Sequence, residues 1–186
     1  MAKVKLNPVL EQIRGRVGDL VFRRRTGGVV VSRNPDRSGL VLSALQEAVR
    51  ERFRLAALYG NAVYADPAQK EVYLAAAKKR GVTAFALAVG DFLHAPSVDE
   101  IDLTGFTGQP GETIVVRASD DFGVARVSVV IRAGDGTIVE QGPAAFERGA
   151  WRYTTTVPAP VGQPVVVEVT ASDRAGNKTV ESLTHG

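Results

Sequence analysis

The chain has 186 residues, of which 45% are hydrophobic and 23% charged, a balance that is typical of folded proteins and excludes wholesale disorder. It contains no cysteine, which excludes disulfide frameworks, thiolate nucleophiles and cysteine-based zinc sites. The net charge of +3 is unevenly distributed: residues 1–96 carry 16 basic and 8 acidic side chains, whereas residues 97–186 carry 7 and 12. This division predicts two domains, 1–96 and 97–186, that face different surroundings.

The first domain is expected to begin with a β-hairpin. The segment VGDLVFRRRTGGVVVSR, residues 17–33, places strand-forming residues on both sides of Thr26-Gly27-Gly28, so we expect strands over 17–25 and 29–33. Each strand has consecutive apolar residues, Leu20 to Phe22 and Val29 to Val31, so both faces of the hairpin need cover. A lone hairpin would be unstable in water.

Three helices follow the hairpin. Ser43 and Gln46 have capping-box spacing at the start of a helix that we expect to reach residue 64. Asp66-Pro67 starts a second helix, which ends at Gly81. A third helix runs from Ala84 to His94 after a Thr83 cap.

The second domain is predicted to be all-β. Short alternating runs are separated by turn residues over about ninety residues, a spacing typical of an antiparallel sandwich. The expected strands are 113–119, 125–131, 137–141, 151–157, 165–172 and 178–183. The predicted fold class is therefore an α+β N-terminal domain, a β-hairpin plus about three helices, followed by an immunoglobulin-like sandwich.

Two segments support that assignment by resemblance. VVRASDDFGVARVSVVIR and VEVTASDRAGNKTVESL resemble bacterial immunoglobulin-like or fibronectin-like domains of surface, adhesive and virion proteins, in which a strand ending in Ala-x-Asp leads through Ala-Gly-Asn to the final strand. The resemblance covers roughly residues 98–184 and implies the fold. IRGRVGDLVFRR is similar to the starts of small uncharacterised bacterial and phage-associated proteins.

Enzymatic chemistry has no support in the sequence. His94 and His185 are the two histidines, and neither belongs to a recognisable Ser-His-Asp signature. The glycine-rich segments lack the spacing of phosphate-binding loops. We therefore expect no enzyme and no cofactor.

Carboxylates near strand ends leave a calcium site as an alternative. The candidate ligands are Asp99, Asp102, Asp120, Asp121 and Asp173. The twelve-residue EF-hand spacing is absent, and aspartate at a strand end commonly caps a turn, so we expect turn formation and no metal.

The longest weakly charged apolar stretch, residues 82–93, contains Gly90 and Asp91 and is shorter than the ~20 residues that a membrane span needs. The first residues show no apolar core of a signal peptide. We therefore expect no membrane span. The default location is cytoplasmic, with a virion or an extracellular assembly as the alternative.

The arginine-rich hairpin is the strongest candidate site, because seven arginines lie between residues 14 and 37. Arginine suits acidic protein surfaces as well as phosphates. The predicted docking residues are Phe22, Arg23, Arg24, Arg25, Val29, Val31 and Arg33.

From this site we expect a non-enzymatic structural protein. The N-terminal half would dock to copies of itself or to a larger particle, and the sandwich would be displayed outward, as in phage decoration proteins or surface-fibre subunits. The first alternative is a nucleic-acid-associated protein that uses the same arginines. The second is a carbohydrate- or cell-binding module built on Phe146, Trp151 and Tyr153.

Overall fold

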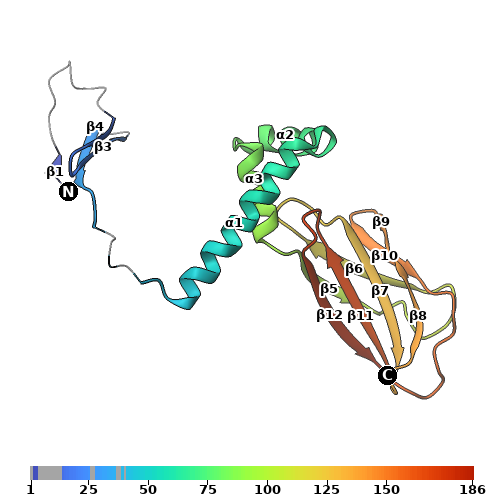
Figure 1. The fold of residues 1–186 in the computed structure, drawn as a ribbon. Helices are drawn as coiled ribbons and strands as arrows, with labels where there is room; N and C mark the ends of the chain where they lie inside the picture. The colour runs from blue at the N-terminus through green and yellow to red at the C-terminus, as the bar shows by residue number, and fades with distance from the viewer. Residues whose placement is uncertain (1, 4–13, 26–27, 37–38, 40) are drawn as a thin grey trace. The chain divides into compact units, whose positions relative to one another are not determined.

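The computed structural model describes residues 2–3, 14–25, 28–36, 39 and 41–186, and it divides the chain into two compact units, residues 1–44 and 45–186 (Figure 1). The three helices thus group with the sandwich, while the hairpin region forms a unit of its own. These units are defined by contacts and not by independent folding, so the division into domains 1–96 and 97–186 stays a prediction.

The first unit contains an antiparallel sheet with strand order β1-β4-β3-β2. Its strands are β1 (Ala2–Lys3), β2 (Gly15–Val17), β3 (Leu20–Arg25) and β4 (Gly28–Arg33). The predicted strand over 17–25 is therefore too long, because the chain reverses at Gly18 and Asp19. Gly18 has φ 56°, a left-handed conformation that glycine adopts at little cost. The expected Thr26-Gly27 connection lies outside the described residues.

The second unit begins with three helices, α1 (Ala44–Ala65), α2 (Pro67–Arg80) and α3 (Ala84–Leu93). The predicted end signals are confirmed: the Asp66 side chain accepts from the backbone N–H groups of Ala68 and Gln69, and Thr83 caps α3. Gly81 ends α2 with φ 68°. His94 lies just after α3 rather than in it.

The helices share a small core of their own. Val63, Tyr73, Ala77, Leu87 and Ala88 are among its buried members. Gly60 allows close packing of α1 on α3, because a Cβ atom there would lie 2.8 Å from the Phe85 ring. No helix among the described residues is both long enough and apolar enough to cross a bilayer.

Two four-stranded antiparallel sheets follow (Figure 1). One has the order β5-β6-β10-β9 and contains β5 (Ser97–Asp102), β6 (Thr113–Ser119), β9 (Ala145–Glu147) and β10 (Ala150–Thr154). The other has the order β12-β11-β7-β8 and contains β7 (Arg126–Ala133), β8 (Ile138–Pro143), β11 (Val165–Ser172) and β12 (Lys178–His185). The protein is therefore α+β with a large β content.

The sandwich core is continuous across the two sheets. Every second residue of β7 and β11 is buried, as the alternating sequence predicts, and in β6 Ile114 and Val116 are buried while Ala118 is partly buried. Ile114, Val116, Val127, Val129 and Val167 have no exposed surface. These side chains come from both sheets, so their burial holds the two layers together.

Two strands were missed in the sequence, and a third is shorter than predicted. β5 pairs with β6 across a register shift between Val98 and Glu100, which interrupts its alternation. β9 has only three residues, too few for a periodic signal. β10 ends at Thr154. The next residue, Thr155, is buried, and its hydroxyl donates to the Gln109 carbonyl in the loop before β6.

Candidate functional site

The first unit's sheet carries the predicted docking residues. The cross-strand pairs are Phe22 with Val31, Arg24 with Val29, and Leu20 with Arg33, and Val17 also pairs with Leu20. Paired residues lie on the same side of a sheet, and neighbours along a strand alternate between sides. One side, which we call the apolar face, therefore contains Val17, Leu20, Phe22, Val29 and Val31, together with Arg24 and Arg33.

The opposite side, which we call the basic face, contains Arg16, Arg23 and Arg25 around Val21 and Val30. The pleat therefore divides the run Arg23-Arg24-Arg25, and Arg24 is separated from its two neighbours. All three side chains are exposed. Arg16, on β2, lies on the same side as Arg23 and Arg25, and the sequence alone did not predict that Arg24 would lie on the other side.

Burial on the apolar face is incomplete. Val29 is 6% exposed, and Phe22 and Val31 are partly buried. Val17 and Leu20, in contrast, are 66% and 44% exposed. A four-stranded sheet that leaves such side chains in water gains stability from any apolar surface that covers them.

The candidate calcium ligands are spread over the second unit, and each side chain contacts residues close to it in the fold. Asp99 accepts from the Ser97 and Ser119 hydroxyls, and Asp102 accepts from the backbone N–H and hydroxyl of Thr104. The Thr104 hydroxyl bond is the main cause of the lowered pKa of Asp102.

The other three candidates lie nearer the helices. Asp120 accepts from the N–H groups of Phe122 and Gly123, and Asp173 accepts from Asn177. The Asp121 carboxylate lies within hydrogen-bonding distance of the His94 ring, with 2.7 Å between Oδ2 and Nδ1. Among the described residues, no three acidic or histidine side chains form a group that could hold a metal ion.

The aromatic candidates of the carbohydrate alternative lie at one sheet. Tyr153 is 7% exposed and Trp151 is packed partly against the core, as expected for residues that alternate inward. Phe146, on the edge strand β9, is 62% exposed, and its ring centroid is 5.2 Å from that of Trp151. Only Phe146 therefore offers a largely exposed ring.

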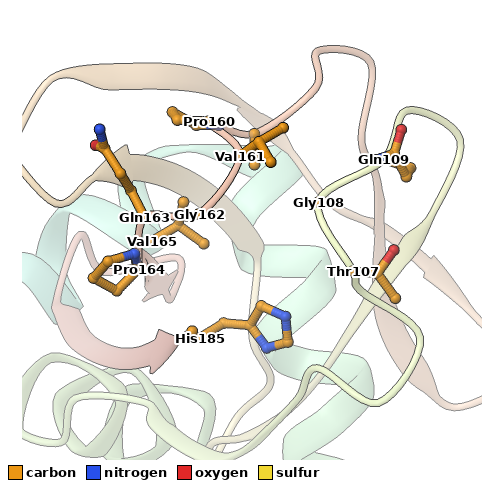
Figure 2. Close-up of a pocket in the computed structure, with 12 residues that line it drawn as sticks. Thr107, Gly108, Gln109, Pro160, Val161, Gly162, Gln163, Pro164, Val165 and His185 are labelled. Atoms are coloured by element: carbon orange, nitrogen blue, oxygen red, sulfur yellow. The ribbon is translucent and has the colours of Figure 1, made fainter.

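A hollow of about 490 Å³ lies among loops at one end of the sandwich (Figure 2). The C-terminus lies at the same end (Figure 1). The walls of the hollow come from the loops at 107–109 and 159–164 and from the end of β12, where the His185 ring lies among them (Figure 2). Glu112 organises one loop by accepting from the N–H groups of Thr107 and Gln109. The side chains that line the hollow include two carboxamides, Gln109 and Gln163, and the His185 imidazole, but no aspartate, glutamate, lysine or arginine.

A buried polar network, not foreseen from sequence, joins the helices to the sandwich. The Tyr73 hydroxyl donates to Asp91 Oδ2, and the Tyr59 and Tyr73 hydroxyl oxygens are 2.9 Å apart. Asp91 is 1% exposed, and its Oδ1 has no hydrogen-bond partner among the described residues. Burial raises its pKa to about 6.

Asn177, in the turn between β11 and β12, completes this junction. Its side-chain amide lies within hydrogen-bonding distance of the carbonyls of Asp91, Phe92 and His94, and of the Asp173 carboxylate. Asn177 is part of the Ala-Gly-Asn turn that supported the sequence resemblance. Here the asparagine bonds to the end of α3, a contact between residues more than eighty positions apart.

No family model and no curated protein matches the chain. Two solved structures are similar to about half of it. CopC from Methylosinus trichosporium OB3b is 15% identical with a TM-score of 0.36, and the match covers 49% of this chain and 90% of CopC. A Br derivative of BhCBM56 is 17% identical with a TM-score of 0.36, and the match covers 50% and 91%. Likenesses at this level carry no argument about function.

Proposed function

We propose that the protein is a non-enzymatic assembly protein whose N-terminal sheet docks to copies of itself or to a larger particle. The observation that carries this proposal is the register of β2, β3 and β4, which gathers Val17, Leu20, Phe22, Val29 and Val31 on one side of the sheet. Val17 and Leu20 are substantially exposed. Apolar side chains arranged in this way favour a protein partner.

The displayed part is an immunoglobulin-like sandwich. In such domains the sheets have the strand orders A-B-E-D and G-F-C. The orders β5-β6-β10-β9 and β12-β11-β7-β8 correspond to these strand by strand, with β8 beside β7 as an added edge strand. This correspondence supports the assignment, and function still has to come from surfaces rather than from the fold.

Assembly is tested by the mass of the full-length protein in light scattering and by its appearance in negative-stain microscopy, at low and high salt. We expect large regular particles that persist in salt, because an apolar interface is screened little. The double variant Leu20→Ser with Phe22→Ser should abolish them. The matched control, Val21→Ser with Val30→Ser, changes the basic face of the same strands. A wild-type protein that stays monomeric at both salt concentrations would contradict the proposal of self-assembly.

A second function is favoured by the basic face. Arg16, Arg23 and Arg25 share one side of the sheet, and phosphate groups attract such a cluster. For a nucleic-acid-associated protein, binding of a labelled DNA duplex should weaken steeply between about 50 and 200 mM salt, by roughly tenfold or more. Exchange of Arg16, Arg23 and Arg25 for glutamine should abolish that binding. A duplex that binds equally well in both salts would contradict this alternative.

A further inference from the structure

A second concave surface lies in residues 45–186, away from the hollow that holds His185. It is a groove of about 680 Å³ between α2 and two turns of the sandwich, residues 122–125 and Arg174. Its apolar floor includes Val72, Ala76, Phe122 and Val124. Small residues line it as well: Ala75 lies on the α2 wall, and a side chain at Gly123 would meet no atom within 4 Å.

The floor is held in place from behind. The Phe122 ring is stacked on that of Tyr73, with 4.4 Å between centroids and 9° between planes. Tyr73 is buried in the helical core. Asp120 Oδ2 fixes the adjoining backbone by accepting from the N–H groups of Phe122 and Gly123. A ligand would therefore meet a wall that is already ordered, which reduces the entropy lost on binding.

Three cations surround this apolar floor. Lys79 and Arg80 come from the last turn of α2, and Arg174 comes from the turn between β11 and β12. In the described part of the chain none of the three forms an ion pair. Of the nearby carboxylates, Asp121 contacts His94, Asp173 accepts from Asn177, and Asp120 accepts from backbone N–H groups. Burial raises the pKa of Asp91, and the charge of Arg174 also acts on this carboxyl by opposing that larger effect. The groove is thus a basic site beside an acidic sandwich.

We infer that this groove binds an acidic peptide segment, with one apolar side chain on the floor and flanking carboxylates on Lys79, Arg80 and Arg174. Lysine and arginine bind carboxylates by charge-assisted hydrogen bonds. The apolar floor supplies contacts that a phosphate backbone cannot use. Residues 97–186, with 12 acidic and 7 basic side chains, would repel a long polyanion beyond the groove.

Lys79 and Arg80 also have a structural explanation, because cations in the last turn of a helix interact favourably with its dipole. Lys78 also lies in the last turn of α2, but it does not line the groove. Lys70 is a second lysine of α2 outside the groove. These two residues supply matched controls that remove the same charge from the same helix.

The test uses full-length protein and the peptide Asp-Glu-Bpa-Glu-Asp, where Bpa is the photoreactive residue benzoylphenylalanine. After irradiation, mass spectrometry locates the cross-links, a readout that separates the groove from the arginines of residues 1–44. We expect cross-links within 72–76 and 122–124. Exchange of Lys79 and Arg80 for glutamine should lower their yield about tenfold, which corresponds to about 1.4 kcal/mol. The Lys70→Gln, Lys78→Gln control should stay within about twofold, since neither residue contacts the groove.

The floor is tested separately. Ala75→Trp fills the groove without changing its charge and should abolish the same cross-links, whereas Leu74→Trp, one position away and outside the groove, should retain them. Three outcomes would overturn the inference. The first is that cross-links form only outside 72–76 and 122–124. The second is that a Lys-Lys-Bpa-Lys-Lys peptide gives the same cross-link yield as the acidic peptide. The third is that the control variants lose as much cross-link yield as the groove variants. Competition by oligothymidine but not by the unlabelled acidic peptide would assign the groove to nucleic acid instead.

Discussion

The sandwich and the N-terminal sheet are both antiparallel, and in both the pleat collects apolar side chains on one side of a sheet, yet only the sandwich buries that side. Twelve buried residues form its core, ten from the two facing sheets and two, Phe106 and Ala144, from loops. In the described part of the first unit, Val29 is the one buried side chain, and Val17 and Leu20 are exposed. The difference shows that alternation creates an apolar face, whereas a second layer is needed to bury it.

This contrast has a functional side. A sheet that is covered within its own chain can present its outer surface and loops without further association. A small sheet with exposed valine and leucine gains stability from a partner, since burial contributes about 25 cal/mol per Å² of apolar surface. This difference supports the proposed division of tasks, in which the sandwich is displayed and the N-terminal sheet docks.

The largest expected effect comes from a cavity in the sandwich. Ile114 has no exposed surface, so Ile114→Ala should lower the free energy of unfolding by about 2–5 kcal/mol. Urea denaturation followed by the fluorescence of Trp151, the single tryptophan, measures this change. Val31→Ala, in the separate N-terminal unit, is the control and should change this transition by less than about 1 kcal/mol. Equal losses would remove the contrast between the two sheets.

The same experiment addresses the domain boundary. If the Asn177 contacts couple the helices to the sandwich, helical circular dichroism should be lost at the same urea concentration as Trp151 fluorescence. Two separate transitions, with Ile114→Ala shifting only one, would support the predicted boundary near residue 96 instead.

A smaller, pH-dependent effect is expected at Asp91. Burial raises its pKa to about 6 from an ordinary value of 3.8, so the folded state binds the proton more tightly than the unfolded state. The stabilisation is fully present below pH 3.8 and is lost as pH rises through about 6. The loss is about 2–3 kcal/mol, because raising a pKa by one corresponds to about 1.4 kcal/mol.

Asp91→Asn removes this ionisation and preserves an oxygen that can accept from Tyr73. Relative to the wild type, the variant should therefore gain stability between pH 4 and pH 7.5, as measured by urea denaturation at both values. Asp99→Asn is the exposed control and should gain little. If the two variants show the same difference between pH 4 and pH 7.5, burial of Asp91 does not control its ionisation.

The sequence predicted the elements whose signals are local. Asp66-Pro67, Gly81 and Thr83 each set a helix end through contacts within four residues, and the alternation of β6, β7 and β11 is confirmed by their burial. The register shift in β5 and the three residues of β9 hid those strands, because both weaken the period-2 pattern.

The candidate sites were predicted less completely, because they depend on contacts between distant residues. The sequence identified Arg23, Arg24 and Arg25 as one cluster, but the pleat and the pairing with β2 decide which arginines share a face. The groove needs α2 and Arg174, residues about a hundred positions apart, to meet. The Asp91 network likewise combines residues from three helices and a sandwich turn.

The smallest expected effect on stability comes from Phe22→Ser in the N-terminal sheet. Phe22 is only partly buried, and it lies in a unit separate from the sandwich core. The urea transition reported by Trp151 should therefore stay within about 0.5 kcal/mol of the wild type, as for surface substitutions. Light scattering of the same samples should nevertheless show a lower mass, because a serine on the apolar face weakens the contact with a partner.

Arg23→Ser is the neighbouring control on the basic face and should leave the mass unchanged at high salt. A loss of mass in both variants would mean that the whole sheet, rather than its apolar face, is needed for assembly. A change in the Trp151 transition with Phe22→Ser would show that the two units depend on one another. In that event the exposed apolar face would stabilise the fold of its own chain, and the proposal of an external partner would lose its main support.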